Sequence, residues 1–321
     1  MSTDPPTPHL VVAVVGATAT GKSALALDLA ERLGGEIVGA DASQLYRGMD
    51  IGTAKVPAEQ RRGVPHHQID VLDIEEDASV AAYQRESRAD LDGILDRDRW
   101  PILVGGSGLY VRAATDRLEI PPTDPEVRAR LEAEAERVGT PEMLARLHAL
   151  DPEAAGRLEP NNTRRIVRAL EVVELTGRPF SATMPRREYL RPTITLGLGL
   201  DRHLLDERIA RRTAAMWANG LLDEVAALEE RGLSRTRTAS RAVGYREALA
   251  ELSGRLTRGE AIEATTTATR RLVRRQESWF RPDPRIVWLD ATDPRLLEHA
   301  LGVVEAAGRG DLGVPGRSDD G

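Results

Sequence analysis

The chain has 321 residues, 41% of them hydrophobic, and a formal net charge of −7. This length allows one large domain or two smaller ones with a packed core, and the absence of cysteine excludes disulfides and thiolate zinc sites. The acidic balance excludes a globally basic surface for nucleic acid, so such binding would use local clusters. With no signal peptide and no apolar run long enough to span a membrane, we expect a cytoplasmic protein.

The clearest motif follows the first predicted strand. A buried strand over Leu10–Val15 runs into Gly16-Ala17-Thr18-Ala19-Thr20-Gly21-Lys22-Ser23, which fits the phosphate-binding pattern G-x-x-x-x-G-K-[ST] at every fixed position. A helix over Ser23–Leu33 follows, as this motif requires. Backbone N–H groups and the helix dipole attract anions in such a loop, Lys22 adds a full charge, and the Ser23 hydroxyl can hold Mg²⁺. The sequence therefore predicts a site for a di- or triphosphate.

Strand and helix patterns then alternate along the chain. Glu36–Ala40 and Ile102–Val104 are predicted strands, and the apolar spacing between Val80 and Leu95 predicts a helix between them. This alternation indicates a parallel sheet covered on both faces. Further strands are predicted at Ile194–Leu200 and Ile286–Leu289, and long helices over His203–Arg231 and Gly259–Phe280.

The stretch between Pro121 and Arg187 carries amphipathic helices and no convincing strand. We therefore predict an α/β fold in which a P-loop NTPase-like parallel sheet core carries an inserted all-helical domain. The expected boundaries are 10–120 plus 190–308 for the discontinuous core and 121–189 for the insertion. Residues 1–9 and 309–321 are expected to be disordered, as is Gly308.

Ligands of an open parallel sheet bind at the carboxyl ends of its strands. Besides the phosphate loop, Asp41 follows one predicted strand and Gly105-Gly106-Ser107 follows another. A carboxylate beside a phosphate site either holds Mg²⁺ or takes a proton from the attacking nucleophile. Leu109 stands where a hydrolase nucleophile elbow needs glycine, so Ser107 is better suited to a phosphate oxygen. His66 and His67 are expected to be loop residues and not metal ligands.

Arginines form two local clusters without matching acids. Arg164, Arg165 and Arg168 begin one predicted helix, and Arg270, Arg271, Arg274 and Arg275 form two i,i+4 pairs on another. Each cluster is either a solvated face or a set of phosphate contacts. Only two of the 44 basic residues are lysine, Lys22 and Lys55. The phosphate loop explains Lys22, whereas Lys55 is either needed as a compact ammonium or simply a surface lysine.

Seven strings in a fixed order carry a wider similarity. They are Gly16–Ser23, Asp41–Tyr46, Gly48–Lys55, Leu103–Tyr110, Asn161–Leu170, Val243–Arg246 and Thr269–Gln276. The series resembles the bacterial tRNA dimethylallyltransferases, also called isopentenyl-tRNA or IPP transferases, from about Val11 to about Leu289. P-loop kinases share only the first string.

The resemblance implies an enzyme that transfers a dimethylallyl group from dimethylallyl diphosphate to N6 of the adenosine just 3′ of the tRNA anticodon, acting as a monomer. It implies that Gly16, Ala17, Thr18, Ala19, Thr20, Gly21, Lys22 and Ser23 bind the diphosphate, with Mg²⁺ at Ser23. Asp41 matches the general base, and Ser107 and Arg270 match groups near the departing diphosphate. The implied tRNA contacts are Asp41, Ala42, Ser43, Gln44, Ser107, Arg128, Arg164, Arg165 and Arg168. Ala42 and Ser107 stand where serine and threonine are common in the family, so position 42 offers no hydroxyl.

An exocyclic adenine amine is a weak nucleophile, so this reaction depends on stabilising the departing diphosphate. The adenine must also leave its stack to reach the site. Three alternatives remain. An adenylate isopentenyltransferase would not need the helical insertion, and a P-loop small-molecule kinase would turn over ATP. A nucleotide-gated RNA-binding module would leave Asp41 without a purpose.

Overall fold

A computed structural model of the chain describes residues 10–183 and 187–311. Contacts between residues divide the chain into two compact units, of which the second is Asp116–Arg187 and the first comprises the residues before and after it. Compactness does not show that either unit folds alone, so the predicted division into domains stays a prediction. The disorder expected for 1–9 and 312–321 lies outside the described residues.

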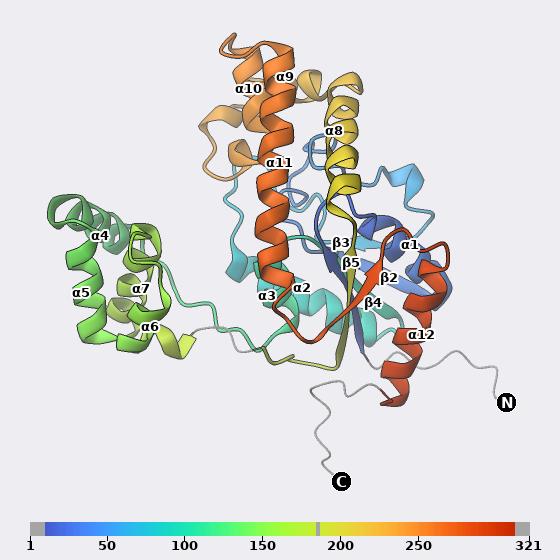
Figure 1. Cartoon of the computed structure of the whole chain (residues 1–321), viewed down its shortest axis with the longest axis horizontal. Coiled ribbons are helices and arrows are strands. Elements are labelled where there is room, and N and C mark those ends of the chain that lie inside the picture. Colours follow the sequence, from blue (N-terminus) through green and yellow to red (C-terminus); the bar gives the residue numbers. More distant parts are fainter. Residues whose placement is uncertain (1–9, 184–186, 312–321) are drawn as a thin grey trace. The chain divides into compact units, whose positions relative to one another are not determined.

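The first unit is built on a six-stranded sheet in the order β3-β2-β4-β1-β5-β6, with every neighbouring pair parallel (Figure 1). The strands are β1 (Val11–Gly16), β2 (Gly35–Gly39), β3 (His66–His67), β4 (Trp100–Gly105), β5 (Thr193–Gly199) and β6 (Ile286–Asp290). Every residue of β1 is buried, as expected for an inner strand of a sheet covered on both faces. The predicted α/β class with a parallel sheet is confirmed.

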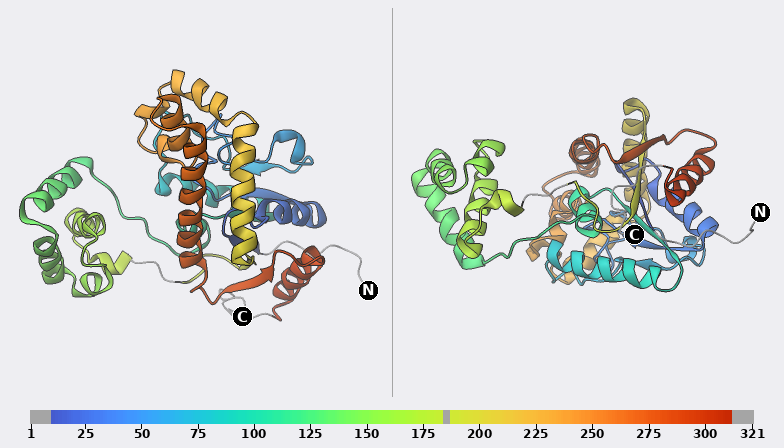
Figure 2. Two further views of the ribbon diagram at one scale, coloured as in Figure 1. Left: turned by 45° about the horizontal axis from the view of Figure 1, so that its top comes forward. Right: turned by 90° about the horizontal axis from the view of Figure 1, so that it is seen from below.

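Two pairs of helices cover this sheet. Helices α1 (Lys22–Leu33) and α12 (Leu296–Arg309) share a hydrophobic cluster with Val12 and Val14, the side chains on one face of β1. Helices α2 (Val80–Leu95) and α3 (Gly108–Thr115) contact each other, and α2 packs on β2 and β4. Figure 2 shows the two pairs on opposite faces of the sheet.

A further group of helices stands beyond the carboxyl ends of the strands. It contains α8 (Arg202–Ala218), α9 (Leu221–Glu230), α10 (Tyr245–Leu252) and α11 (Arg258–Phe280), with α8 and α11 side by side (Figures 1 and 2). The single helix predicted over His203–Arg231 is wrong, because the chain turns between α8 and α9. Gly220 has φ 95°, a left-handed conformation that glycine adopts easily, and it ends the helical run.

The second unit contains only helices among its described residues. They are α4 (Pro125–Val138), α5 (Thr140–Leu150), α6 (Pro152–Arg157) and α7 (Thr163–Thr176). Leu131, Met143, Leu147, Ile166 and Leu170 form its own core. Short 3₁₀ turns complete the two units: η1 (Ala58–Gln60), η2 (Phe180–Thr183), η3 (Leu233–Arg235) and η4 (Ala239–Arg241).

Two further local predictions need correction. His66 and His67 form the edge strand β3 and are not loop residues, with His67 Nε2 lying 2.7 Å from Glu36 Oε2. Gly308 and Arg309, expected in a disordered tail, form the last turn of α12, which Gly310 caps at φ 81°.

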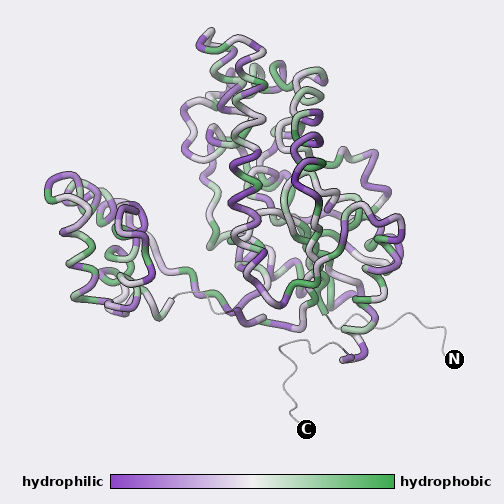
Figure 3. Tube along the Cα trace, viewed as in Figure 1, coloured by the Kyte–Doolittle hydropathy of each residue, from purple (hydrophilic) through white to green (hydrophobic). Residues whose placement is uncertain are grey.

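Figure 3 shows mainly hydrophobic residues along the strands, whereas hydrophobic and hydrophilic residues alternate along the helices. Among the helices of residues 10–183 and 187–311, none is both long and apolar enough to cross a membrane.

Candidate active site

The phosphate loop lies between β1 and α1, as predicted. Gly16 has φ 137°, and a Cβ atom there would lie 2.8 Å from the Leu198 carbonyl oxygen, so only glycine fits. Gly21 has φ 100° and precedes the first turn of α1. The Ala17 carbonyl oxygen accepts hydrogen bonds from Thr20 Oγ1 at 2.8 Å and from Lys22 Nζ at 2.6 Å. These contacts give the loop its curled shape, with the Lys22 ammonium drawn toward the loop's own backbone.

Two other strand ends meet this loop because β2, β4 and β1 are neighbours in the sheet. Asp41 follows β2, and its Oδ1 accepts a hydrogen bond of 2.9 Å from the Ser43 backbone N–H. Gly105 ends β4 so close to β2 that a Cβ would lie 2.1 Å from the Ala40 carbonyl oxygen. Gly106 follows, with Gln276 Nε2 only 2.3 Å from where its Cβ would be. The glycines therefore allow the β4 turn and α11 to approach Asp41.

Two cavities at these strand ends have Asp41 in their walls. The larger, about 590 Å³, is lined by Thr18, Ala19, Gly21, Lys22 and Ser23 of the loop and by Asp41, Gln44, Gly105 and Gly106. The smaller, about 260 Å³, is lined by Asp41, Ser43 and Ser107 and by residues of α8 and α11. Thr18, Ala19, Asp41, Thr53, Arg212 and Gln276 line both. A molecule bound at the phosphate loop thus reaches Asp41 and the second cavity through one shared boundary.

Arg212 is the main residue that the sequence reasoning missed. It comes from α8, and its Nη1 donates a hydrogen bond of 3.1 Å to Thr18 Oγ1. The pKa of Arg212 is lowered, because burial disfavours its charge more than the nearby Asp41 carboxylate favours it. Arg208 and Arg211 of the same helix also line the larger cavity. Spacing of three and four residues places these arginines on one helix face, and that spacing is visible in the sequence.

Lys22 is a further cation of the larger cavity, beside these arginines. Burial lowers its pKa from 10.5 to about 8; Asp41 opposes this shift, and Arg212 adds to it. A cationic cluster that burial disfavours in the free protein is suited to a multiply charged anion.

Arg270 lines neither of these cavities, and its expected place beside the diphosphate stays a prediction. Its Nε lies 3.5 Å from Asp206 Oδ1. On the same helix Thr269, Leu272 and Gln276 do line the smaller one. These three residues recur at helical spacing, and Arg270 lies about 100° around the helix from Thr269. Gln276 is fixed there because its Oε1 accepts a 2.8 Å hydrogen bond from the Thr18 backbone N–H.

Comparison with known proteins identifies the family of this chain. The model of the IPP transferase family matches residues 44–283. The chain belongs to this family. It is 57% identical over 298 residues to a tRNA dimethylallyltransferase of Streptomyces avermitilis, covering 93% of this chain and 95% of that protein. A second protein of that name, from Nocardioides sp., is 55% identical over 94% of this chain and 98% of its own length.

Solved structures of similar proteins agree with this membership. A tRNA isopentenylpyrophosphate transferase from Bacillus halodurans is 37% identical with a TM-score of 0.70, covering 94% of this chain and 98% of its own. A eukaryotic dimethylallyltransferase acting on tRNA is 26% identical with a TM-score of 0.80, covering 97% of this chain and 81% of its own.

The residues that line the larger cavity fit a magnesium ion bound together with a diphosphate. Mg²⁺ keeps several waters and binds through one or two protein oxygens plus phosphate oxygens. The Ser23 side chain and the Asp41 carboxylate both line that cavity. Within the described residues there is no cluster of three or more acidic, histidine or cysteine side chains that would hold a metal by itself. The donor set therefore suits a metal that arrives with its ligand.

The predicted tRNA-contacting arginines of the second unit are of two kinds: some pair with a buried carboxylate and others are exposed to solvent. Arg128 and Arg168 both pair with Glu171, whose side chain is 0% exposed, at 2.5 and 2.9 Å. Arg168 also donates to the carbonyl oxygens of Pro121 and Pro122. Arg164 and Arg165, at the start of α7, are exposed. Arg128 and Arg168 therefore hold this unit together, whereas Arg164 and Arg165 are available to a ligand.

Proposed function

We propose that this protein transfers the dimethylallyl group of dimethylallyl diphosphate to N6 of the adenosine 3′-adjacent to the anticodon in tRNA. The products are N6-(dimethylallyl)adenosine and diphosphate. The observation that carries the proposal is the boundary shared by the two cavities, where Asp41 and Arg212 face both. A diphosphate at the loop would place its allylic carbon at this boundary, and an adenine entering the smaller cavity would meet it beside Asp41.

Each residue has a chemical part in this scheme. The bond from the allylic carbon to the diphosphate oxygen breaks as the bond from N6 to that carbon forms, and Asp41 accepts the N6 proton. Lys22, the loop N–H groups and Arg212 stabilise the negative charge that develops on the diphosphate. Bound Mg²⁺, held by Ser23, would supply further neutralisation of that charge. Ser107 offers a hydroxyl in the smaller cavity.

The nature of the acceptor is supported by the second unit and by the relatives. Both curated relatives and both solved structures carry names that refer to tRNA. The exposed Arg164 and Arg165 offer phosphate contacts that an adenylate isopentenyltransferase would not need. Action as a monomer is part of the proposal.

The test supplies the protein with dimethylallyl diphosphate, Mg²⁺ and tRNA that lacks the modification, without ATP. We expect one dimethylallyl unit per modified adenosine by mass spectrometry of digested tRNA, and an equal amount of released diphosphate. AMP in place of tRNA tests the adenylate isopentenyltransferase reading, and should remain unmodified. The protein would instead be a kinase if ATP gave ADP and a phosphorylated acceptor and no prenylated nucleoside formed.

A further inference from the structure

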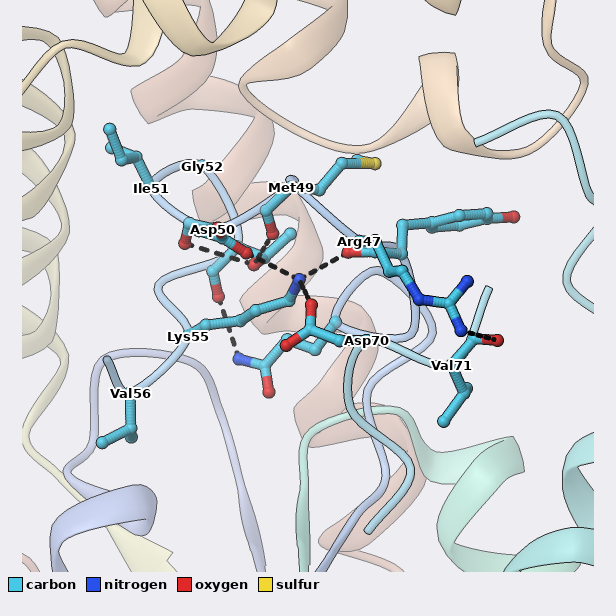
Figure 4. Close-up of polar contacts among 12 residues, drawn as sticks. Arg47, Met49, Asp50, Ile51, Gly52, Lys55, Val56, Asp70 and Val71 are labelled. Carbon is cyan, nitrogen blue, oxygen red and sulfur yellow. Dashed lines mark hydrogen bonds and ion pairs between the residues drawn. The ribbon is translucent and has the colours of Figure 1, made fainter. Parts of the chain in front are cut away.

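The string Gly48–Lys55, which we call the 48–55 segment, contains a lysine that neither phosphate binding nor proton transfer explains. Lys55 is not a surface lysine, since its side chain is only 3% exposed. Its Nζ donates to Asp50 Oδ1 at 2.8 Å, to Asp70 Oδ1 at 2.5 Å and to the Tyr46 carbonyl oxygen at 2.5 Å. Figure 4 shows the ammonium surrounded by these oxygens. The lysine thus joins three separate points of the chain.

The geometry of these contacts accounts for a lysine in a chain that otherwise uses arginine. An ammonium has three N–H donors in a tetrahedral arrangement, and Lys55 has three acceptors. A guanidinium is larger and its donors lie in one plane, so it would not serve three converging oxygens in the same space. The two carboxylates, Asp50 and Asp70, compensate the buried charge.

The other side of the 48–55 segment is held by the helices. Glu224 of α9 accepts hydrogen bonds from the backbone N–H groups of Asp50, Ile51 and Gly52 at 3.1, 2.8 and 3.4 Å. The Tyr245 hydroxyl donates to the same carboxylate at 2.5 Å. A Cβ on Gly52 would lie 2.4 Å from the Tyr245 ring, so the segment lies directly against α10. The segment is therefore fixed from two directions.

The 48–55 segment forms part of the wall of both cavities. Thr53 lines both cavities and Gly52 lines the smaller one. The Thr53 carbonyl oxygen accepts a 3.0 Å hydrogen bond from Gln44 Nε2, and Gln44 lines the larger cavity with Asp41. Since that carbonyl can only accept, it fixes which end of the Gln44 amide faces it, and the amide oxygen remains for a substrate. Lys55 holds Asp50, the Asp50 carbonyl oxygen accepts a 3.4 Å hydrogen bond from Thr53 Oγ1, and Thr53 in turn holds Gln44.

We propose that Lys55 is a positioning residue for the acceptor nucleoside: its three-point ammonium contact holds the 48–55 segment so that Gly52 and Thr53 shape the wall of the smaller cavity beside Asp41. This rests on the proposed function. The phosphate loop has independent supports in Gln276 and Arg212, so binding of the donor diphosphate does not depend on Lys55.

The test compares Lys55→Met and Lys55→Arg with Arg62→Met. Arg62 is a matched control because its Nη1 also bridges two carboxylates, Asp28 and Glu31 at 2.7 and 2.9 Å, but it is exposed and lines neither cavity. We expect both Lys55 variants to weaken tRNA binding and to slow single-turnover transfer roughly 10- to 100-fold, the usual effect of a small displacement at a reacting centre. Affinity for dimethylallyl diphosphate should be unchanged. Lys55→Arg should recover only part of the loss, and Arg62→Met should match the wild type.

Asp50→Ala provides a variant that keeps the buried lysine and should fold, because the Asp50 side chain is 57% exposed. It should shift tRNA affinity and transfer rate in the same direction by a smaller factor. A purely structural role would lower the melting temperature while the rate per folded molecule and the tRNA affinity stay at wild-type values, and that result would overturn the inference. A wild-type protein that makes no prenylated adenosine overturns the proposed function instead.

Discussion

At the scale of single residues, Lys22 shows how a charge buried in a binding site lowers the folding stability of the ligand-free protein. Its pKa is lowered from 10.5 to about 8 by burial, despite the opposing effect of Asp41. The unfolded chain therefore binds this proton more tightly than the folded chain. Holding the charged ammonium costs stability at all pH values below about 8, and the cost falls away as the pH rises toward 10.5.

We expect Lys22→Met to raise the melting temperature of the ligand-free protein at pH 7, because the variant buries no charge. The gain should shrink at pH 10, where the wild-type lysine is largely neutral when folded. Thermal unfolding at both pH values measures this. A gain that stays constant with pH would contradict the assigned cause. Added dimethylallyl diphosphate with Mg²⁺ should stabilise the wild type and not the variant, since only the wild type binds it tightly.

Asp41 gives a second test at this scale. Asp41→Asn keeps the size of the side chain and the acceptor for the Ser43 N–H, but removes the base. We expect transfer to slow by roughly 10²–10⁴ in single turnovers, with the melting temperature and the tRNA affinity close to those of the wild type. Asp28→Asn, in the exposed ion pair with Arg62, is the control. A rate within a few-fold of the wild type would remove Asp41 from the role of base.

The site residues that sequence reasoning found are those next to strands. Asp41 and Ser107 each lie two residues after the end of a strand, β2 and β4. The carboxyl ends of parallel strands meet at one edge, so the sequence places both residues without knowledge of packing. Arg212 is different, because it reaches Thr18 from a helix whose position over the sheet depends on tertiary contacts. The prediction for Arg270 depends on tertiary contacts for the same reason. Which face of α11 meets the cavity cannot be read from a cluster of arginines.

At the scale of elements, α7 combines solvent-exposed and structural arginines within two turns. Asn162 caps its first turn by accepting from the Arg165 N–H, and Arg164 and Arg165 project there into solvent. One turn later Arg168 faces the buried Glu171, whose pKa is lowered, against its desolvation, by hydrogen bonds from Arg128, the Asp124 N–H and Arg168. A prediction that treats the three arginines of α7 as one group therefore mixes two effects.

We expect Arg164→Ala with Arg165→Ala to weaken tRNA binding and to reduce the slope of log affinity against log salt by roughly one to two, because fewer counterions are released. Donor affinity and melting temperature should not change. Arg168→Ala is the contrasting variant: removing a partner of Glu171 should lower the melting temperature. If the double variant leaves the salt slope unaltered, these two arginines are a solvated face and not a tRNA contact.

Helices and strands were predicted well where the spacing of hydrophobic residues agrees with residues that start or stop an element, as in β1 and α1. The helix over His203–Arg231 was predicted too long because Asn219 and Gly220, the break between α8 and α9, were not weighed as a stop. The strand β3 has two residues and depends on pairing with Ile37 and Val38, so no local pattern marks it. The helix α12 did carry a signal, since Ala300, Val304 and Ala307 recur at helical spacing.

At the scale of the whole molecule, the chain interrupts its sheet-based unit at one place. The first unit ends at Thr115 and resumes at Glu188, and the Leu190 N–H donates a 2.8 Å hydrogen bond to the Thr115 carbonyl oxygen. The points where the chain leaves and returns are therefore adjacent within the first unit. The sequence indicated this arrangement because strand patterns stop before Pro121 and return at Ile194. The hydrophobic core of the second unit, centred on Leu131 and Ile166, belongs to that unit alone.

Adjacent ends and a separate core predict that the second unit can be removed. Replacing residues 116–187 by a short Gly-Ser linker from Thr115 to Glu188 should leave a protein that unfolds cooperatively and still binds dimethylallyl diphosphate with Mg²⁺, because every residue lining the two cavities lies in the first unit. Its tRNA affinity should fall, together with the salt dependence that Arg164 and Arg165 contribute. Calorimetry for the donor and filter binding for tRNA separate the two effects. A shortened chain that binds neither ligand would show that the sheet-based unit needs the second unit to fold. One that binds tRNA as tightly as the full chain would show that the first unit alone grips the anticodon stem-loop.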